Sequence, residues 1–392
     1  MRILQIFNRY EQFGGEEAAV REIEEALREK HTVTTFYGST REMMGTGLTG
    51  KLLAPIKAVW NRRAFVQLSE LQAKEHFDVW IVHNVFPGLS PAVYDAAKRC
   101  GVPVVQYLHN YRFACINGFL LNHGEPCQRC LNGNFIPAVQ TKCWQESRLA
   151  CATMGISLTR LRAVGVFNQV SHWIAISHAQ KAIHTKIGIP AEKISVIYHF
   201  FNGIYSEGPP DRRDVLFIGR ISPEKGVGLL LDAWLKLPAT DRRLWIVGDG
   251  PLRQELERRA LGRADIVFTG FLQGADLEAV WEKAVVSVVP SIWEEAFGRV
   301  LIESWAHGVP VLAARIGALP ELIEATGAGW LFEPRNADDL GAQLNLISSD
   351  RPSLQKVASR CAAAVARFSR QAWLREIEAV LDSMGIPHPT ES

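Results

Sequence analysis

Short apolar runs alternate with segments of helical periodicity along most of the chain. Runs with few polar positions are typical of parallel strands covered on both faces, because such strands lose the apolar–polar alternation of a half-exposed sheet. In the first half these runs are Ile3–Phe7, Asp78–Asn84, Pro103–Leu108, His172–Ser177 and Ile194–His199. Helical patterns run from about Glu17 to Lys30 and over Thr159–Asn168. This alternation predicts an α/β domain with a doubly wound parallel sheet.

The second half repeats the pattern. Its predicted strands are Val215–Gly219, Leu244–Val247, Ile266–Gly270, Val285–Val289 and Trp330–Phe332, and its predicted helices are Val227–Leu237, Asp339–Ile347, Leu354–Phe368 and a last run at 370–385. Between the halves, Gly208-Pro209-Pro210-Asp211 has the composition of a linker. A chain of 392 residues is also too long for one core. We therefore expect two α/β domains, at 1–205 and 206–369.

Composition narrows the function classes. The formal net charge is +2, so no global basic field indicates nucleic acid, and a hydrophobic fraction of 47% is that of a globular protein. The first residues lack the features of a secretory signal, and no stretch approaches the ~20 apolar residues that cross a bilayer. We expect a cytoplasmic protein.

The most informative stretch is Pro290–Glu303, which reads as the end of a strand, a loop and the start of a helix. Gly298 lets a ligand approach bare backbone, and the first-turn N–H groups present the positive end of the helix dipole. An anion is expected there. Glu295 is placed on the loop, and Glu303 about two turns inside the helix.

Glu295 and Glu303 match a Glu-x7-Glu pattern, and Gly317-Ala318-Leu319-Pro320-Glu321 follows it. Together these motifs resemble the family-4 glycosyltransferases, and the resemblance extends over nearly the whole chain. It implies the GT-B fold, with two facing Rossmann-like domains and a C-terminal helix, within 370–392, that crosses back to the first domain. It also implies retaining sugar transfer without a catalytic metal or cofactor, and no Asp-x-Asp occurs in the sequence.

The resemblance assigns most of the donor residues to the second half. Arg220 and Lys225, after Gly219, match the pair that holds the donor diphosphate. Glu295 would contact the sugar and Glu303 the ribose. The remaining donor contacts are at the helix start and at two turns around the base: Phe297, Gly298, Arg299, Val300, Gly250 and Phe271.

In the first half, Gly14-Gly15 resembles the loop with which these enzymes meet the donor diphosphate, although a simple helix-entry turn explains the pair equally well. His109, at a strand end, matches a family histidine that contacts the donor sugar. His83 is interpreted as structural. Arg112 is a candidate for an acceptor's diphosphate, because its planar guanidinium suits phosphate.

Five cysteines fall within the predicted insertion 112–151, and Cys127-Gln-Arg-Cys130 has the spacing of a zinc knuckle. A loop with few apolar residues gains folding energy from a metal. Cys115, Cys127, Cys130 and Cys143 are the natural ligands of a structural zinc. Reduced buried thiols and redox bridging remain alternatives.

Residues 51–63 carry four basic side chains and no acidic one, with Leu52, Ile56, Val59 and Trp60 at helical spacing. Such a helix can lie on an anionic membrane surface. The favoured interpretation is that the apolar stripe packs on the sheet, because most amphipathic helices serve a core.

We therefore expect a retaining transferase that moves a hexose from a UDP- or GDP-type sugar to a glycan or a lipid-linked oligosaccharide in polysaccharide biosynthesis. Peripheral contact of 51–63 with the inner face of the membrane is the alternative to packing of this segment on the sheet. The alternatives are an epimerase or phosphorylase on the same fold, and an inactive scaffold that binds glycan or metal. A nicotinamide dehydrogenase is poorly supported, because Gly14-Gly15 lacks the third glycine of that fingerprint.

Overall fold

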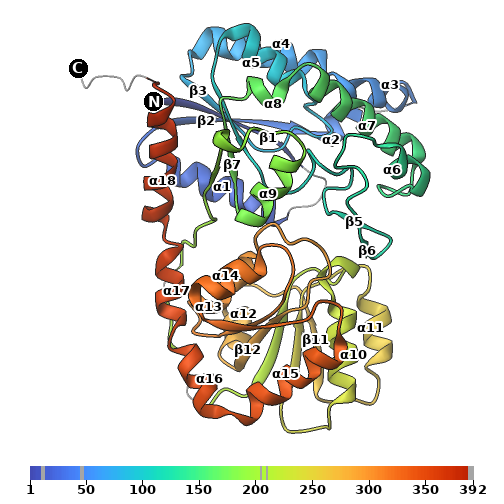
Figure 1. Cartoon of the computed structure of the whole chain (residues 1–392), viewed down its shortest axis with the longest axis vertical. Helices are drawn as coiled ribbons and strands as arrows, with labels where there is room; N and C mark the ends of the chain where they lie inside the picture. The colour runs from blue at the N-terminus through green and yellow to red at the C-terminus, as the bar shows by residue number, and fades with distance from the viewer. Residues whose placement is uncertain (10–13, 45–47, 204, 209–210, 387–392) are drawn as a thin grey trace. The chain divides into compact units, whose positions relative to one another are not determined.

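A computed structural model describes residues 1–9, 14–44, 48–203, 205–208 and 211–386 (Figure 1). The chain divides into two units. The first comprises Met1–Asn122, Cys127–His199 and the segment from Arg370, and the second comprises His123–Pro126 and Phe200–Ser369. The division thus falls at 199/200, where the sequence predicted 205/206. Pro209 and Pro210 of the predicted linker lie outside the described residues.

The first unit is built on a six-stranded parallel sheet of order β2-β1-β3-β4-β7-β8. The strands are β1 (Arg2–Arg9), β2 (Thr32–Ser39), β3 (Val79–Val82), β4 (Val104–Tyr107), β7 (His172–Ala175) and β8 (Ile194–Val196). The first strand, β1, is second from one edge of the sheet, and the order in which strands are added reverses between β1 and β3. Strand β2 was not predicted from the sequence, because this edge strand is only half covered and carries threonines where a central strand carries valines.

Helices flank this sheet (Figure 1). They are α1 (Gly15–Leu27), α2 (Thr40–Met44), α3 (Leu48–Val59), α4 (Arg62–Glu75), α5 (Ala92–Cys100), α6 (Ile136–Thr141), α7 (Arg148–Ala163), α8 (Val166–Gln169), α9 (His178–Lys186), the 3-10 turn η1 (Ala191–Lys193) and α18 (Arg370–Ser383). The prediction of one helix over Thr159–Asn168 is wrong. Gly165 adopts a positive φ of 75° between α7 and α8, and this left-handed residue ends the first helix.

The C-terminal helix α18 belongs to the first unit, as the resemblance implied. Trp373 donates its indole N–H to the hydroxyl of Tyr107 at 3.2 Å, and His31 lies 2.7 Å from the Glu378 carboxylate. The predicted doubly wound fold with a returning helix is confirmed.

The second unit contains a parallel sheet of order β11-β10-β9-β12-β13-β14. Its strands are β9 (Asp214–Ile218), β10 (Leu244–Val247), β11 (Ile266–Gly270), β12 (Ala284–Val289), β13 (Val311–Ala314) and β14 (Gly329–Phe332). The strand order reverses between β9 and β12. In doubly wound sheets, ligands bind beyond the carboxyl ends of the strands at such a point.

The helices of this unit are η2 (Pro223–Lys225), α10 (Val227–Lys236), α11 (Arg253–Arg259), α12 (Gly274–Trp281), α13 (Arg299–Ala306), α14 (Leu319–Thr326), α15 (Ala337–Ser349), α16 (Arg351–Ala358) and α17 (Cys361–Arg367). The segment Leu354–Phe368, predicted as one helix, is divided between α16 and α17. Buried apolar side chains from β9, β10, α10 and α15 form the main core of the unit.

Helix α3 corrects one expectation. Leu52, Leu53 and Ile56 are exposed, with 71% of Leu52 and 65% of Ile56 open to solvent, so this part of the stripe does not pack on the sheet. Only the end of the segment is anchored: Ala58 is buried and its carbonyl accepts a 3.0 Å hydrogen bond from Ser157 on α7. The side chain of residue 51 lies outside the described residues. In the described ranges, no helix combines the length and the apolarity that crossing a membrane demands.

Candidate active site

The loops after β9 and β12 are packed backbone to backbone at the point where the strand order of the second unit reverses. The backbone N–H of Ile292 donates to the carbonyl of Glu224 at 3.0 Å. Gly226 has a φ of +69°, and a Cβ there would lie 1.8 Å from the carbonyl oxygen of Pro290. Only glycine fits, because the position needs both a left-handed conformation and the absence of a side chain.

An ion pair joins the same two loops. Lys225 Nζ lies 2.6 Å from Glu295 Oε1, which also accepts a hydrogen bond from Ser291 Oγ at 2.7 Å. Glu295 is only 5% exposed, whereas the Lys225 side chain is 31% exposed. The ammonium also lies 5.1 Å from the ring centroid of Trp293. Lys225 thus balances a buried carboxylate and still presents an accessible cation.

The motif at residues 317–321 fixes the backbone of Glu295. The N–H of Ala318 donates to the Glu295 carbonyl at 2.9 Å, and a Cβ on Gly317 would come within 2.4 Å of that carbonyl oxygen. From the sequence, this motif was identified only as a family signature. In the structure the motif fixes the backbone of Glu295, and thereby the position of its carboxylate.

Helix α13 begins at Arg299, directly after Gly298 with a φ of +96°. Glu303 is therefore the fifth residue of the helix, little more than one turn inside it, and the prediction of about two turns is wrong because the loop extends further than expected. Arg299 Nε lies 4.0 Å from Glu303 Oε1, and Val300 is half-buried. Phe297 is buried, and its ring packs edge-on against Phe368.

The other predicted donor residues lie at this same end of the sheet. Gly219 and Arg220 follow β9, and Arg220 is exposed. A Cβ on Gly250 would lie 2.3 Å from the carbonyl oxygen of Ile221, so the loop after β10 is packed on the loop after β9. Phe271, directly after β11, is 72% exposed, which is unusual for an aromatic side chain and suits a ring that stacks on a ligand.

In the first unit, His109 lies at the carboxyl end of β4 among other rings. His109 Nε2 is 2.8 Å from His83 Nδ1, and its ring stacks on Tyr107 at 4.9 Å and on His199 at 5.6 Å between centroids. Burial, and secondarily the neighbouring His109, holds the pKa of His83 well below its usual range. His83, interpreted as structural from the sequence, is thus a neutral ring that orients His109. His199 was predicted only as the end of a strand and not as part of this group of rings.

Arg112 lines the same pocket as His109, together with Glu16 and Asn110. Its guanidinium donates to the carbonyl of Ile116 and lies 5.1 Å from the ring centroid of Trp144. These contacts within the cysteine-rich insertion give Arg112 a structural task. Its role toward an acceptor phosphate stays a prediction.

Gly14 and Gly15 lie at the start of α1, and a Cβ on either would meet open space. Gly14 has an extended backbone that any residue adopts. The pair therefore leaves room above the first turn of α1 but satisfies no conformational requirement. Residues 10–13 of the predicted loop lie outside the described residues.

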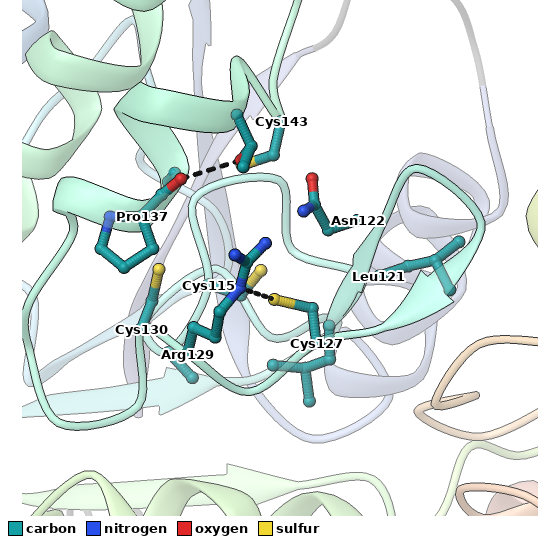
Figure 2. Close-up of a pocket in the computed structure, with 12 residues that line it drawn as sticks. Cys115, Leu121, Asn122, Cys127, Arg129, Cys130, Pro137 and Cys143 are labelled. Atoms are coloured by element: carbon teal, nitrogen blue, oxygen red, sulfur yellow. Dashed lines mark hydrogen bonds between the residues drawn. The ribbon is translucent and has the colours of Figure 1, made fainter.

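The four cysteines predicted as metal ligands line one pocket, shown in Figure 2. All are free thiols. Burial raises the pKa of Cys130 to about 11 and that of Cys143 to about 12, so these thiols are poor nucleophiles. As arranged in the structure, the described residues contain no group of three His, Cys, Asp or Glu side chains positioned to hold a metal ion.

Two family models match the chain. The model described as Glycosyltransferase Family 4 matches residues 13–202, and the model described as Glycosyl transferases group 1 matches residues 212–350. The first covers most of the first unit and the second covers most of the second unit.

Curated relatives match over part of their length. Sulfoquinovosyl transferase SQD2 of Arabidopsis thaliana is 37% identical over 149 residues, which are 37% of this chain and 28% of that protein. The putative colanic acid biosynthesis glycosyltransferase WcaL of Salmonella typhimurium is 29% identical over 219 residues, 50% of this chain and 53% of that protein. The aligned regions thus span about half of these relatives or less.

Solved structures share the fold over nearly the whole chain. HepE of Anabaena in complex with UDP has a TM-score of 0.70 at 21% identity, covering 98% of this chain and 100% of that one. WaaG, a glycosyltransferase involved in lipopolysaccharide biosynthesis, has a TM-score of 0.66 at 16% identity, covering 96% and 99%.

Proposed function

Because the chain belongs to the family-4 glycosyltransferases of GT-B fold, we propose that it transfers a hexose from a nucleotide-diphosphate sugar to a glycan or lipid-linked acceptor, with retention of configuration at the anomeric carbon. The observation that carries the proposal is the Lys225–Glu295 ion pair between the loops after β9 and β12. It places an accessible cation and a fixed carboxylate at the edge of the sheet where the α13 N-terminus also opens.

The donor occupies this edge of the second unit. Breaking the glycosyl bond leaves negative charge on the diphosphate and positive charge on the anomeric carbon. Arg220, Lys225 and the first N–H groups of α13 neutralise the departing diphosphate, an oxyanion-type stabilisation by groups already in place. The helix dipole adds to this effect at Gly298 and Arg299.

The two glutamates have separate tasks. Glu303, just over one turn into α13, accepts hydrogen bonds from the ribose hydroxyls. Glu295 accepts hydrogen bonds from the hydroxyls of the transferred sugar and stabilises the positive charge that develops on it. Phe271 offers its exposed ring to the nucleotide base. Structural neighbours in complex with UDP and with UDP-glucose support a uridine nucleotide as the first donor to test.

A matched panel of ligands and variants tests this assignment. UDP, GDP, TDP and ADP, each with and without a sugar, are compared by thermal shift, because a ligand that binds only the native state raises the melting temperature. We expect one nucleotide to stand out, and Lys225→Ala and Glu303→Ala to abolish most of its shift. Lys236→Ala is the control, since Lys236 forms an exposed ion pair with Asp338 in the same unit.

A uniform absence of shift across the panel would overturn the proposal. Incubation with the responding sugar nucleotide alone separates the epimerase alternative: a transferase produces at most slow hydrolysis, whereas an epimerase produces an isomer.

The acceptor side includes a membrane contact. Leu52, Leu53 and Ile56 on α3 are exposed, and Ile156 on the neighbouring α7 is exposed as well. Arg62 and Arg63, exposed at the start of α4, add positive charge beside them. An apolar face next to basic side chains fits an anionic membrane surface, where a lipid-linked acceptor resides.

Co-sedimentation with vesicles tests the contact. We expect the protein to bind phosphatidylglycerol vesicles better than phosphatidylcholine vesicles, and a Leu52→Ser, Ile56→Ser double variant to lose that binding. Leu261→Ser is the matched control, because Leu261 is an equally exposed leucine in the second unit. Equal sedimentation of the double variant and the control would contradict the assignment.

A further inference from the structure

The insertion between β4 and α7 contains little regular structure. Between Cys115 and Cys143, the helix α6 and the two-residue strands β5 (Leu121–Asn122) and β6 (Glu125–Pro126) are its elements. Eight described residues other than glycine have a positive φ, and five of them lie here or just beyond: Leu120, His123, Lys142, Gln145 and Glu146. A left-handed conformation costs free energy for each such residue. Other interactions within the insertion must compensate for this free-energy cost.

Cysteine thiols from separate parts of the insertion meet at one pocket. Cys115, Cys127, Cys130 and Cys143 all line it, and Figure 2 shows them on segments that surround a common space. Backbone hydrogen bonds bring the segments together: Cys127 N–H donates to the Leu120 carbonyl at 2.7 Å. Asn117 accepts from Cys115 Sγ at 3.0 Å and donates to the Cys143 carbonyl at 3.3 Å.

We propose that Cys115, Cys127, Cys130 and Cys143 bind one zinc ion that holds the insertion together. Four thiolates are a complete tetrahedral ligand set for structural zinc, and the Cys127-x-x-Cys130 spacing is that of a zinc knuckle. The rest of the wall is largely apolar, with Ala114, Leu121 and Pro137 among its members, so water gains little there.

The guanidinium of Arg129 lies beside the proposed zinc site, where it can offset the negative charge of the thiolates. Four thiolates around Zn²⁺ carry a net charge of −2, and outer-shell donors stabilise such sites. Arg129 Nε already donates to Cys127 Sγ at 3.4 Å. As arranged in the structure, the described side chains are not positioned to hold a metal ion, so zinc binding requires Cys115 Sγ to turn from Asn117 toward the pocket and the other three sulfurs to converge with it.

The alternatives make different predictions for the same thiols. In the structure none of the seven cysteines is in a disulfide. Redox bridging would pair the four thiols covalently on air oxidation, and simple buried thiols would leave them metal-free. Zinc binding protects four of the seven thiols from modification as a group and releases them together when the metal is removed.

The test is metal analysis of the full-length protein purified without chelator. We expect one zinc per chain in the wild type and in Cys100→Ser, a control whose thiol lies outside the cluster, and loss of zinc with a lower melting temperature in Cys127→Ser and Cys130→Ser. If those variants fail to fold, the wild type still provides the test. Cobalt substitution should give the absorption of a tetrahedral thiolate site, and the half-buried Cys127 and Cys143 should react with a thiol reagent only after a chelator removes the metal.

Absence of zinc from wild-type protein produced with zinc in the medium would overturn the proposal. Disulfides among the four cysteines found by mass spectrometry in freshly purified protein would overturn it in favour of a redox role. Because these readouts use no nucleotide or sugar, the result does not depend on the proposed transferase activity.

Discussion

Replacing Lys225 with methionine separates the structural from the ligand-binding part of the site. The substitution keeps the length of the side chain and removes the ammonium that lies 2.6 Å from Glu295. Removing one partner of a buried ion pair costs about 3–5 kcal/mol, because the remaining charge is uncompensated. Lys225 is partly exposed and Ser291 still donates to Glu295, so we expect the lower end, about 3 kcal/mol.

A second substitution recovers that loss without restoring ligand binding. In the Lys225→Met, Glu295→Gln double variant no buried charge is left unpaired, so most of the stability should return. The diphosphate has still lost its cation. A hydrogen bond to a charged group contributes about 1.5–3 kcal/mol, so the nucleotide Kd should rise about 10- to 150-fold in both variants.

Urea unfolding measures the first quantity and isothermal titration with the responding nucleotide measures the second. The cycle of two single variants and the double variant gives the coupling between the side chains. If Lys225→Met binds the nucleotide with the wild-type Kd, the ammonium serves only to balance Glu295. Recovery of affinity in the double variant would refute the reasoning equally, because Lys225 would then act through Glu295 alone.

Three further predictions concern substitutions of single residues. Burial lowers the pKa of His184 to about 4, while the unfolded chain takes up a proton near the ordinary value of 6.5. The stability it contributes is therefore complete above pH 6.5 and lost toward pH 4, by up to about 3 kcal/mol, and His184→Gln should flatten that part of a urea-unfolding profile. Gly226→Ala should lower the free energy of unfolding by at least about 2 kcal/mol, whereas Gly262→Ala, also at positive φ but facing open space, should cost only about 1–2 kcal/mol; equal losses would show that the Pro290 contact is unimportant. Glu303→Gln should weaken the responding nucleotide about 10-fold or more but leave its 2′,3′-dideoxy analogue almost unaffected, and an equal loss for both in titrations would argue against a ribose contact.

The sequence predicted most of the central strands, because buried parallel strands are apolar along their whole length. It did not predict β13, although this strand is fully buried in the second unit. It missed β2, since an edge strand with one open side need not be apolar, and it joined α16 and α17, because periodicity alone does not reveal a break between helices. These errors do not involve β9 and β12, the strands whose loops form the candidate site.

The candidate site was predicted as a set of residues but not as a set of contacts. Lys225 and Glu295 were recognised from their separate motifs, yet their pairing depends on how two loops meet across the sheet, which no local pattern encodes. His83 was interpreted as a structural residue for the same reason. Its contact with His109 joins the ends of two strands, and the two histidines are 26 positions apart in the sequence. The exposure of Leu52 and Ile56 was also not predicted, because a hydrophobic stripe in the sequence does not indicate whether another element packs on it.

The glycines at 226, 250 and 317 have a consequence for how this protein can diversify. Each one is pressed against a carbonyl oxygen of the adjacent loop, so a larger residue at any of them forces the backbone apart. The loop framework around the proposed diphosphate site therefore does not tolerate gradual changes in side-chain size. New donor preferences, whether selected in nature or in the laboratory, should arise instead at open positions such as Phe271, where a change of side chain displaces nothing behind it.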